Sequence, residues 1–410
     1  RAEGLAARRL AARQAAAAPA LAASSATREP AGGGGGEADG WLGVLGREVG
    51  RPHVSDDAPA PLVAAYCVAM EEEVFGSAEL LEEAAAQRHH YARNAEESGS
   101  GAGALPALRR ALMREFKALR GGQLPLHPDA AILLRHDEGR MDVMRAVLSG
   151  PVGTPYALGL FVFDAFCPAE YPAIPPLVHL ETTGGGTVKF NPNLYADGKV
   201  CLSLLGTFSG SNATEKWDPA VSTIFQVLVS IQSQILVPNP MANEPGYDGK
   251  EDSAQSKEYN AKLRLHTMRH AMTAVLRSPP AGFEDAVRAH FAAQRDRVLQ
   301  QCWAWAEEAP ADMRDKMLGA LHALHAALPP CTGDGASSGL PSDAAAASST
   351  PAAPGPSAAG ASGADADEAA GAPRPISSSK FRDGVELSGA APGGADTDDD
   401  IYAHEVYDRD

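Results

Sequence analysis

The stretch between residues 130 and 182 constrains the fold of this chain most strongly. Three apolar segments follow one another there, AAILLRHD, MDVMRAVLSGP and YALGLFVFDAF, with Gly-Pro and Gly-Thr-Pro turns between them. Short runs rich in β-branched and aromatic residues between such turns are typical of antiparallel strands. The next segment, CPAEYPAIPPLVHLET, is too rich in proline for a central strand before LVHLET. We therefore predict three or four short antiparallel strands.

An amphipathic helix is predicted before the strands, in LPALRRALMREFKALRGG. Its apolar residues follow the i, i+4, i+8 spacing of one helix face, and basic residues lie between them. These apolar residues are Leu108, Leu112, Phe116 and Leu119. The Gly-Gly pair that follows ends the pattern.

A second helix is expected after the strands, at about 219–237. Its residues are apolar on most sides, so we expect it to be largely buried. Asp218 is a good N-cap, and Pro219 suits the first helical position. Further helices are expected at 256–277, 282–308 and 311–327.

Residues 41–97 carry further helical patterns. APLVAAYCVAMEEEVF places apolar residues at helical spacing, and SAELLEEAAAQRHHYARNAEE indicates a second helix. The second segment contains His89 and His90, which suggest metal ligands at first sight. Because adjacent residues on a helix do not face each other, we favour a solvated or partner-facing pair over a metal site.

Both ends of the chain have low sequence complexity. Residues 1–40 are rich in Ala, Arg and Gly, and 329–410 are rich in Ala, Gly, Ser and Pro before an acidic end. Such compositions bury too little apolar surface to fold, so we expect disorder. The opening residues resemble a transit peptide or an Ala-rich linker. We favour the linker, because a sequence that starts at Arg1 rather than Met is expected to be part of a longer chain.

The order of elements is helix, antiparallel strands, a long irregular segment, helix and then more helices. This order predicts an α+β domain of about 150 residues with a helical extension. The expected segments are 1–40 without structure, 41–97 helical, 105–278 the α+β domain, 279–328 the extension and 329–410 a disordered acidic tail.

Charge and cysteine content argue against several functions. The net charge of −17 argues against broad binding to nucleic acid or to an anionic membrane. The 5 cysteines are scattered without CxxC spacing, which favours free thiols in a reducing compartment over a disulfide framework or zinc module. No apolar run approaches the ~20 residues of a membrane span. We therefore expect a cytoplasmic, or also nuclear, protein that binds neither nucleic acid nor membrane.

One cysteine lies in a polar setting. In KFNPNLYADGKVCLSLLG, turn-forming residues precede Cys201 and an apolar run comes after it. Asn193 lies eight positions earlier, and an asparagine amide can donate to a developing oxyanion without ionising. Lys199 is the only basic neighbour, so the pattern favours a thiol that accepts an already activated acyl group. Without this motif, a lone cysteine before LSLL would be assigned to the core; with it, we expect a thiol at the lip of a shallow groove.

Residues from about 108 to 277 resemble the catalytic domain of ubiquitin-conjugating enzymes. GPVGTPYALGLFVFDAFCPAEYPAIPP is similar to the family signature across its strands. NPN followed by Cys201 matches the family's His-Pro-Asn motif and active cysteine at the same spacing, and KWDPAVST and LVPNP match the loop and the end of its second helix. The resemblance implies the ubiquitin-conjugating fold: an N-terminal helix, an antiparallel meander sheet, a buried second helix and C-terminal helices.

A narrower resemblance extends to about residue 327. ETTGGGTVKFNPNLYADGKVCLSLLGTF, VLVSIQSQILV and NEPGY are similar to the large inhibitor-of-apoptosis-type (BRUCE/Apollon-like) conjugating enzymes. FEDAVRAHFAAQRDRVLQQCWAWAE resembles the segment on the C-terminal side of their catalytic domain. This resemblance suggests a conjugating enzyme with built-in ligase activity. The Cys/His spacing of an inhibitor-of-apoptosis repeat does not occur in the sequence, so no anti-apoptotic role is implied.

The resemblance implies roles for several polar residues. Cys201 would form the thioester with the ubiquitin C-terminus, and Asn193 would stabilise the oxyanion or support the loop. Asn191 stands where the family has His, a position expected chiefly to brace the loop. Glu244 stands where an acidic residue orients the incoming lysine, and Asn243 is a rival for that place because the loop is longer here.

The resemblance also implies partners. They are ubiquitin, the ubiquitin-activating enzyme, protein substrates and a ubiquitin ligase. Trp217 and Pro219 would keep one ligase-contact loop, whereas Ala173 stands where many members place an aromatic residue in the other, which leaves that contact open. ATP is consumed by the activating enzyme, so the resemblance implies no metal or organic cofactor in this domain.

Two other functions stay open beside this leading hypothesis of an acyltransferase. A non-catalytic variant of the same fold would bind ubiquitin as a scaffold, but such variants typically lack the cysteine. A cysteine hydrolase would need a histidine, and His179 is the nearest one upstream of Cys201. It lies in an alternating strand, where we favour a structural role.

Overall fold

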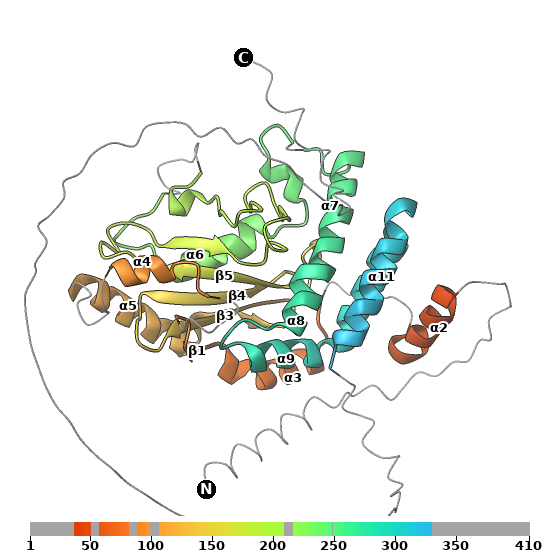
Figure 1. Cartoon of the computed structure of the whole chain (residues 1–410), viewed down its shortest axis with the longest axis horizontal. Helices are drawn as coiled ribbons and strands as arrows, with labels where there is room; N and C mark the ends of the chain where they lie inside the picture. Colours follow the sequence, from red (N-terminus) through yellow and green to blue (C-terminus); the bar gives the residue numbers. More distant parts are fainter. Residues whose placement is uncertain are drawn as a thin grey trace, which may run out of the picture. The chain divides into compact units, whose positions relative to one another are not determined.

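The computed structural model describes residues 37–50, 57–81, 88–98, 106–208, 216–247 and 249–329. Most of the two low-complexity ends lies outside these ranges, and the disorder expected there stays a prediction. The first helix nevertheless begins at Glu37, inside the segment expected to lack structure. No helix in the described ranges has both the length and the apolar character to cross a membrane. Figure 1 shows a central sheet with helices packed around it.

Five strands form the main path of one sheet, in the order β1-β3-β4-β5-β6, and β2 pairs with β3 beside this path. The strands are β1 (Phe75–Ala78), β2 (Leu126–His127), β3 (Ala130–Asp137), β4 (Val143–Ser149), β5 (Leu160–Phe166) and β6 (Leu177–Leu180). From β3 to β6 each strand pairs antiparallel with the next, which confirms the predicted meander. All residues of β4 and β5 are buried, as expected for strands covered on both faces.

The helices confirm most of the predicted positions. The first predicted helix, α5 (Pro106–Ala118), buries Leu108, Leu112 and Phe116 as their spacing indicates. The other helices are α2 (Glu37–Val49), α3 (Ala60–Met70), α4 (Ala92–Glu97), α6 (Ile224–Ser230), α7 (Ala254–His266), α8 (Val275–Arg277), α9 (Glu284–Ala293), α10 (Arg295–Glu308) and α11 (Ala311–Ala327). Short helical turns add Glu71–Glu73, Leu119–Gln123, Ser203–Leu205, Ile231–Ile235, Pro240–Asn243 and Thr267–Ala274.

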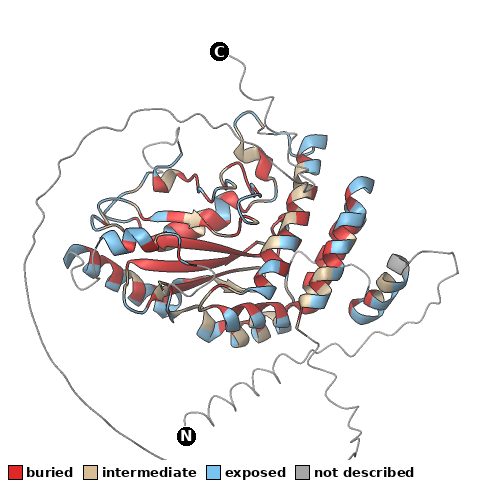
Figure 2. Cartoon of the chain, viewed as in Figure 1, coloured by how far each residue is buried: buried red, intermediate tan, exposed pale blue. Residues whose placement is uncertain are grey.

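Two apolar cores cover the two faces of the sheet. In β3, Ile132 and Leu134 belong to a first core, which includes residues of α5 and α6. Ala131 and Leu133 belong to a second core on the other face of the sheet. This alternation is the two-residue period of a strand. Figure 2 shows the buried strands in red between the layers. The second core also holds residues of α2, α3, α9, α10 and α11, so these segments pack on the sheet and share its core.

The helix expected over 77–97 is wrong. The chain instead enters the sheet as β1, which lies parallel to β3 with Ser77 opposite His136, and among the described residues 77–81 and 88–97 the only helix is α4. Strand formation here depends on a partner far away in the sequence, which local periodicity does not show. The prediction that His89 and His90 form a solvated or partner-facing pair is wrong for His89. This residue is 2% exposed, and its Nε2 donates to the Met144 carbonyl at 2.8 Å. His90 is exposed.

Two further boundaries differ from the prediction. The second helix of the α+β domain begins at Ile224, because Thr223 and Gln226 form a capping box there. Asp218 caps a turn instead: the Ala220 N–H donates to its Oδ1 at 2.9 Å. The segment expected as one helix at 282–308 is two helices, α9 and α10, because the backbone leaves helical geometry at Gln294.

Candidate active site

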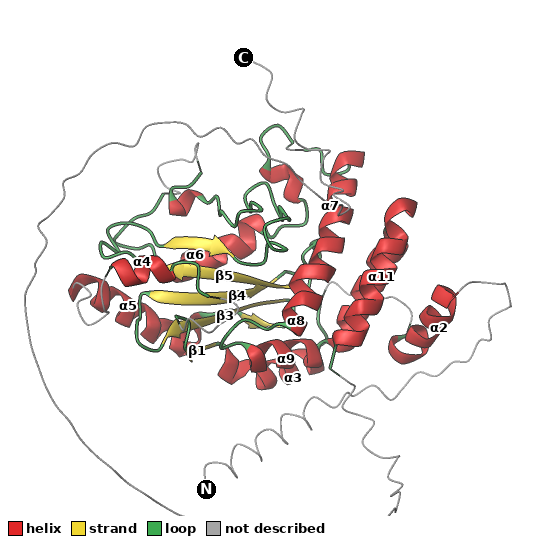
Figure 3. Ribbon diagram, in the orientation of Figure 1, coloured by secondary structure: helices red, strands yellow, loops and turns green. Residues whose placement is uncertain are grey.

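Cys201 lies in the long segment between β6 and α6. Figure 3 draws most of the described part of this segment as loop. Isolated bridges fold this segment back on itself and pair Leu194 with both Asn191 and Val200. The Cys201 N–H donates to the Asn193 carbonyl at 2.9 Å. The structure therefore brings the cysteine and the asparagine of the sequence motif together.

The residues after Cys201 fix its backbone. The Thr207 hydroxyl donates to the Val200 carbonyl at 2.7 Å and accepts the Leu202 N–H at 3.0 Å. A short turn over Ser203–Leu205 lies inside this closure. Cys201 is only 6% exposed, so it is more enclosed than a thiol on the lip of an open groove.

Asn191 is fully buried at the centre of a hydrogen-bond network. Its Nδ2 donates to the Ile235 carbonyl at 2.8 Å and to the Tyr156 hydroxyl at 3.2 Å. Its Oδ1 accepts the Asn193 N–H at 2.8 Å and an Nδ2–H of Asn243 at 3.2 Å. Both donors and both acceptor positions of the amide are therefore used. This arrangement braces the loop and leaves no group of Asn191 for chemistry.

Tyr156 also belongs to this network, although no role was predicted for it from the sequence. Its hydroxyl donates to the Phe190 carbonyl at 2.6 Å while accepting from Asn191. Burial raises the pKa of Tyr156 well above its ordinary value, so the phenol stays protonated and keeps this donor. In the sequence, Tyr156 is marked only by its place in the turn after Gly-Thr-Pro. No local pattern predicts its contact with Asn191, which lies 35 positions away.

Asn193 is held through its backbone and is half-buried. Its N–H donates to Asn191 and its carbonyl accepts from Cys201. Within the described ranges, its side-chain amide has no hydrogen-bond partner. The amide is therefore available to a group that enters beside Cys201.

Glu244 and Asn243 take different places after α6. Asn243 donates to Asn191 and also to the Gln234 carbonyl at 3.2 Å, so it belongs to the bracing network. Glu244 is half-buried, and its N–H donates to the Met241 carbonyl. Its carboxylate makes no hydrogen bond within the part of the chain that is described, and no described contact joins it to Cys201.

The two expected ligase-contact loops are tied together. The Trp217 indole N–H donates to the Pro172 carbonyl at 2.7 Å, and the ring packs against Tyr171. Ala173 and Pro219 are exposed on either side of this contact. Exposed apolar side chains beside them are Ile174 and Val221.

Glu115 of α5 joins the same region, and its role was missed in the sequence. It accepts the Tyr171 hydroxyl and, at 2.9 Å, the N–H of Ile224 at the start of α6. Burial raises the pKa of Glu115, and these two hydrogen bonds offset part of the rise. The position was hidden because its partners lie 56 and 109 residues away.

No histidine hydrogen-bonds to Cys201 within the described residues. His179 faces His90 and Glu181 instead, and the row of paired residues Arg145, Asp164 and His179 runs across β4, β5 and β6. A hydrolase arrangement of cysteine and histidine is therefore not formed by this geometry.

The other cysteines offer no comparable setting. Cys167 and Cys302 are fully buried, and burial raises the pKa of both thiols. Cys67 is half-buried and donates to the Leu126 carbonyl, and Cys331 lies outside the described residues.

Comparison with known proteins agrees with this geometry. Residues 111–267 match the family model described as "Ubiquitin-conjugating enzyme". The match begins in α5, covers β2 to β6, the Cys201 loop and α6, and ends one residue after α7; β1 lies outside it.

Similar curated proteins carry names of the same family. The human "Dual E2 ubiquitin-conjugating enzyme/E3 ubiquitin-protein ligase BIRC6" is 43% identical over 246 residues, which cover 58% of this chain and 5% of that protein. "Probable ubiquitin-conjugating enzyme E2 25" of Arabidopsis thaliana is 48% identical over 178 residues, 42% of this chain and 28% of that protein. "Probable ubiquitin-conjugating enzyme protein 17" of Caenorhabditis elegans is 42% identical over 216 residues, 51% and 29%. The chain thus spans less than a third of each of these relatives.

Among solved structures, the E2 domain of a Toxoplasma gondii ubiquitin conjugating enzyme is 26% identical. It covers 40% of this chain and 99% of its own, with a TM-score of 0.30. The family match, the curated relatives and the meander sheet with its Asn-Pro-Asn loop lead to one assignment. This chain contains a ubiquitin-conjugating enzyme domain, which the family model places at residues 111–267.

Proposed function

We propose that this protein accepts ubiquitin as a thioester on Cys201 and transfers it to the amine of a substrate lysine. The observation that carries the proposal is the loop in which Asn191 braces Asn193 beside Cys201, within a domain of the conjugating-enzyme family. The braced loop needs no histidine, because the Asn191 amide fills all its hydrogen-bond positions. In this proposal the Asn191 side chain takes the place of the histidine expected from the family motif and holds the backbone of Asn193.

The reaction proceeds in two acyl transfers. The Cys201 thiolate attacks the carbonyl carbon of the thioester between ubiquitin and its activating enzyme, and the cysteine of that enzyme leaves as a thiolate. The lysine amine then attacks the new thioester, an isopeptide bond forms, and the Cys201 thiol leaves. Asn193 donates its side-chain N–H to the oxyanion in each tetrahedral intermediate. Glu244 is the candidate that orients the amine, since Asn243 is engaged in bracing.

The proposal includes the partners of a conjugating enzyme: ubiquitin, the activating enzyme that consumes ATP, protein substrates and a ligase. The tied loops of Trp217 and Pro172 present Ala173 and Pro219 as the contact face. The name of the human relative combines conjugating enzyme and ligase, which supports built-in ligase activity here as well. We propose a cytoplasmic, or also nuclear, location, because scattered cysteines without a disulfide pattern suit a reducing compartment.

A charging reaction tests the proposal. The chain is incubated with activating enzyme, ATP and ubiquitin, and the products are separated on a non-reducing gel. We expect a thiol-sensitive adduct for the wild type, a thiol-resistant oxyester for Cys201→Ser and no adduct for Cys201→Ala.

The half-buried thiol of Cys67 supplies a matched control. Cys67→Ala removes another accessible cysteine and should charge like the wild type. An adduct that persists in Cys201→Ala would refute the assignment of the nucleophile. A wild type that forms no adduct would favour a ubiquitin-binding scaffold instead.

A further inference from the structure

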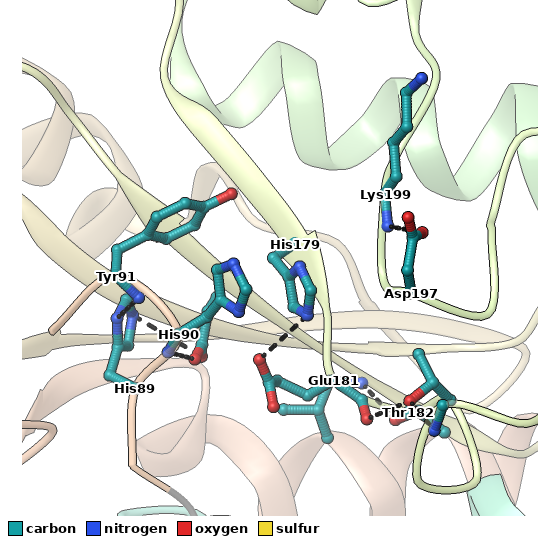
Figure 4. Close-up of polar contacts among 12 residues, drawn as sticks. His89, His90, Tyr91, His179, Glu181, Thr182, Asp197 and Lys199 are labelled. Atoms are coloured by element: carbon teal, nitrogen blue, oxygen red, sulfur yellow. Dashed lines mark hydrogen bonds and ion pairs between the residues drawn. The ribbon is translucent and has the colours of Figure 1, made fainter. Parts of the chain in front are cut away.

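A second cluster of polar side chains lies away from Cys201, between the segment before α4 and strand β6. It consists of His90, His179 and Glu181, shown in Figure 4. His179 and Glu181 are two positions apart along an extended segment, so their side chains lie on the same face. One ligand atom of each of the three residues lies within 4.8 Å of those of the other two. The cluster therefore joins two parts of the chain that are far apart in sequence.

Buried neighbours hold the cluster in place. The His90 N–H donates to Asp164 Oδ2 at 2.7 Å. Arg145 in turn holds Asp164 through two hydrogen bonds, of 2.6 Å from Nε and 2.8 Å from Nη2, and both side chains are almost fully buried. His179 is opposite Asp164 in the strand register. One buried ion pair thus lies beside both histidines and fixes the backbone of His90.

Gly198 fixes His179 from the other side. A Cβ atom at Gly198 would lie 2.1 Å from Cε1 of His179, so only glycine admits the ring there, and the positive φ of 83° also favours glycine. Gly198 belongs to the loop that leads to Cys201, and its carbonyl accepts the Leu180 N–H at 2.8 Å. The cluster therefore lies against the base of the Cys201 loop.

The contacts within the cluster are not those of a hydrogen-bonded pair. Nε2 of His179 and Oε1 of Glu181 are 3.6 Å apart, beyond hydrogen-bond distance. Neither histidine ring has a hydrogen-bond partner in the described part of the chain. Two imidazoles and one carboxylate, open to solvent on the side of His90, are a ligand set that zinc uses with water in the fourth position.

The distances suit a shared ion. Around zinc at about 2.0–2.2 Å from each ligand atom, neighbouring ligand atoms lie about 3.3–3.6 Å apart. His179 and Glu181 already have that separation. The rings of His90 and His179 are stacked with centroids 3.4 Å apart, so the exposed His90 ring has to turn about its side-chain torsions to direct a nitrogen to the same centre.

We propose that His90, His179 and Glu181 bind one divalent transition-metal ion, with Zn²⁺ favoured by this ligand set. The bound ion ties the segment before α4 to β6, on the opposite sheet face from Val178 and Leu180, which share a core with Val200 and Leu202 of the Cys201 loop. No described contact connects its ligand atoms with Cys201, so the ion is given no part in the chemistry at that thiol. The site does not depend on the proposed ubiquitin transfer.

Metal binding by the 410-residue chain tests the proposal. All proteins carry Cys201→Ser, so that the loop thiol does not compete for metal. We expect one Zn²⁺ per chain, a higher unfolding temperature with Zn²⁺, and a Co²⁺ spectrum without a sulfur-to-metal charge-transfer band. His90→Ala and Glu181→Gln should each weaken the Zn²⁺ affinity by at least about tenfold. His179 is left unchanged, because its ring packs against Gly198.

His127→Ala is the matched control. Nδ1 of His127 lies 3.3 Å from Asp129 Oδ2, which makes it another accessible histidine beside a carboxylate. This variant should bind Zn²⁺ like its parent, and metal-free His90→Ala should keep the parent's unfolding temperature because His90 is exposed. Equal affinity in the parent, His90→Ala and Glu181→Gln, or no stoichiometric binding by the parent, would overturn the proposal. The stacked histidines would then be a packing contact only.

Discussion

At the scale of single residues, Asn191 shows how a substituted motif keeps its geometry. An imidazole has two ring nitrogens, whereas the Asn191 amide has two N–H donors and an oxygen that accepts twice. The structure uses all four, toward Ile235, Tyr156, Asn193 and Asn243. In the proposed function, Asn191 therefore braces the loop and Asn193 takes part in the chemistry.

The two asparagines should therefore differ in how much each contributes to the free energy of unfolding. Asn191→Ala leaves buried partners unsatisfied and should lower the free energy of unfolding by about 1–3 kcal/mol, measured by urea denaturation. Asn193→Ala removes only a side chain without partners in the described ranges and should change stability by less than about 0.5 kcal/mol.

Activity should separate the same two variants. Asn193→Ala should slow discharge of the Cys201 thioester onto free lysine by about 10²–10³-fold, because the oxyanion loses a donor. A stable Asn193→Ala protein with the wild-type discharge rate would show that Asn193 supports the loop only.

At the scale of elements, the start of α6 shows why caps are ambiguous in a sequence. Both Asp218-Pro219 and Thr223 with Gln226 are sound helix starts locally. The structure uses the second, since the Ile224 N–H is already accepted by Glu115 of α5. The first pair forms the turn that carries Pro219 to the surface beside Trp217. Tertiary contact therefore selected between two caps of similar strength.

Thermal and urea unfolding of cap variants test this choice. Thr223→Ala should lower the free energy of unfolding by about 1 kcal/mol, because α6 loses its capping side chain. Thr223→Ser should recover most of that loss. Asp218→Ala is the control at the cap expected from the sequence, and its effect should stay within about 0.5 kcal/mol because Asp218 is exposed and outside the helix. A larger loss in Asp218→Ala than in Thr223→Ala would contradict the assignment.

At the scale of the molecule, helices from both ends of the described chain cover the second face of the sheet. Tyr66 of α3 donates its hydroxyl to Nδ1 of His290 in α9 at 2.9 Å. Nε2 of His290 lies 3.2 Å from the Leu158 carbonyl and therefore carries the proton. The neutral imidazole of His290 in α9 thus links α3 with the turn before β5. Burial lowers the pKa of His290 to about 4.

This link predicts a loss of stability in mild acid. The folded-state pKa is about 4 and lies below the unfolded value of about 6.5, so the unfolded chain binds a proton first as the pH falls. Stability from this group is complete above the unfolded pKa and is lost toward the folded pKa, by about 2 kcal/mol between pH 7.5 and 5.0.

His290→Gln gives the comparison for this pH dependence. Glutamine can accept from Tyr66 and donate to Leu158 but does not titrate. Urea denaturation at the two pH values should show a steeper decline for the wild type than for His290→Gln. Equal declines would mean that the imidazole link does not contribute to the pH dependence.

Elements with local signals could be predicted from the amino-acid sequence. The spacing of Leu108, Leu112 and Phe116 specified α5, and short apolar runs between turns specified β3 to β6. The motif of Asn193 and Cys201 located the candidate site, because loop closure over a few residues is a local property.

The tertiary structure alone decided what depends on distant partners. β1 is a strand because β3 pairs with it, and α6 starts at Ile224 because Glu115 meets it there. The four partners of Asn191 and the meeting of His90 with His179 arise in the same way. The physical reason is common to all of them: hydrogen bonds and packing between distant segments gain their energy only once the chain has closed on itself.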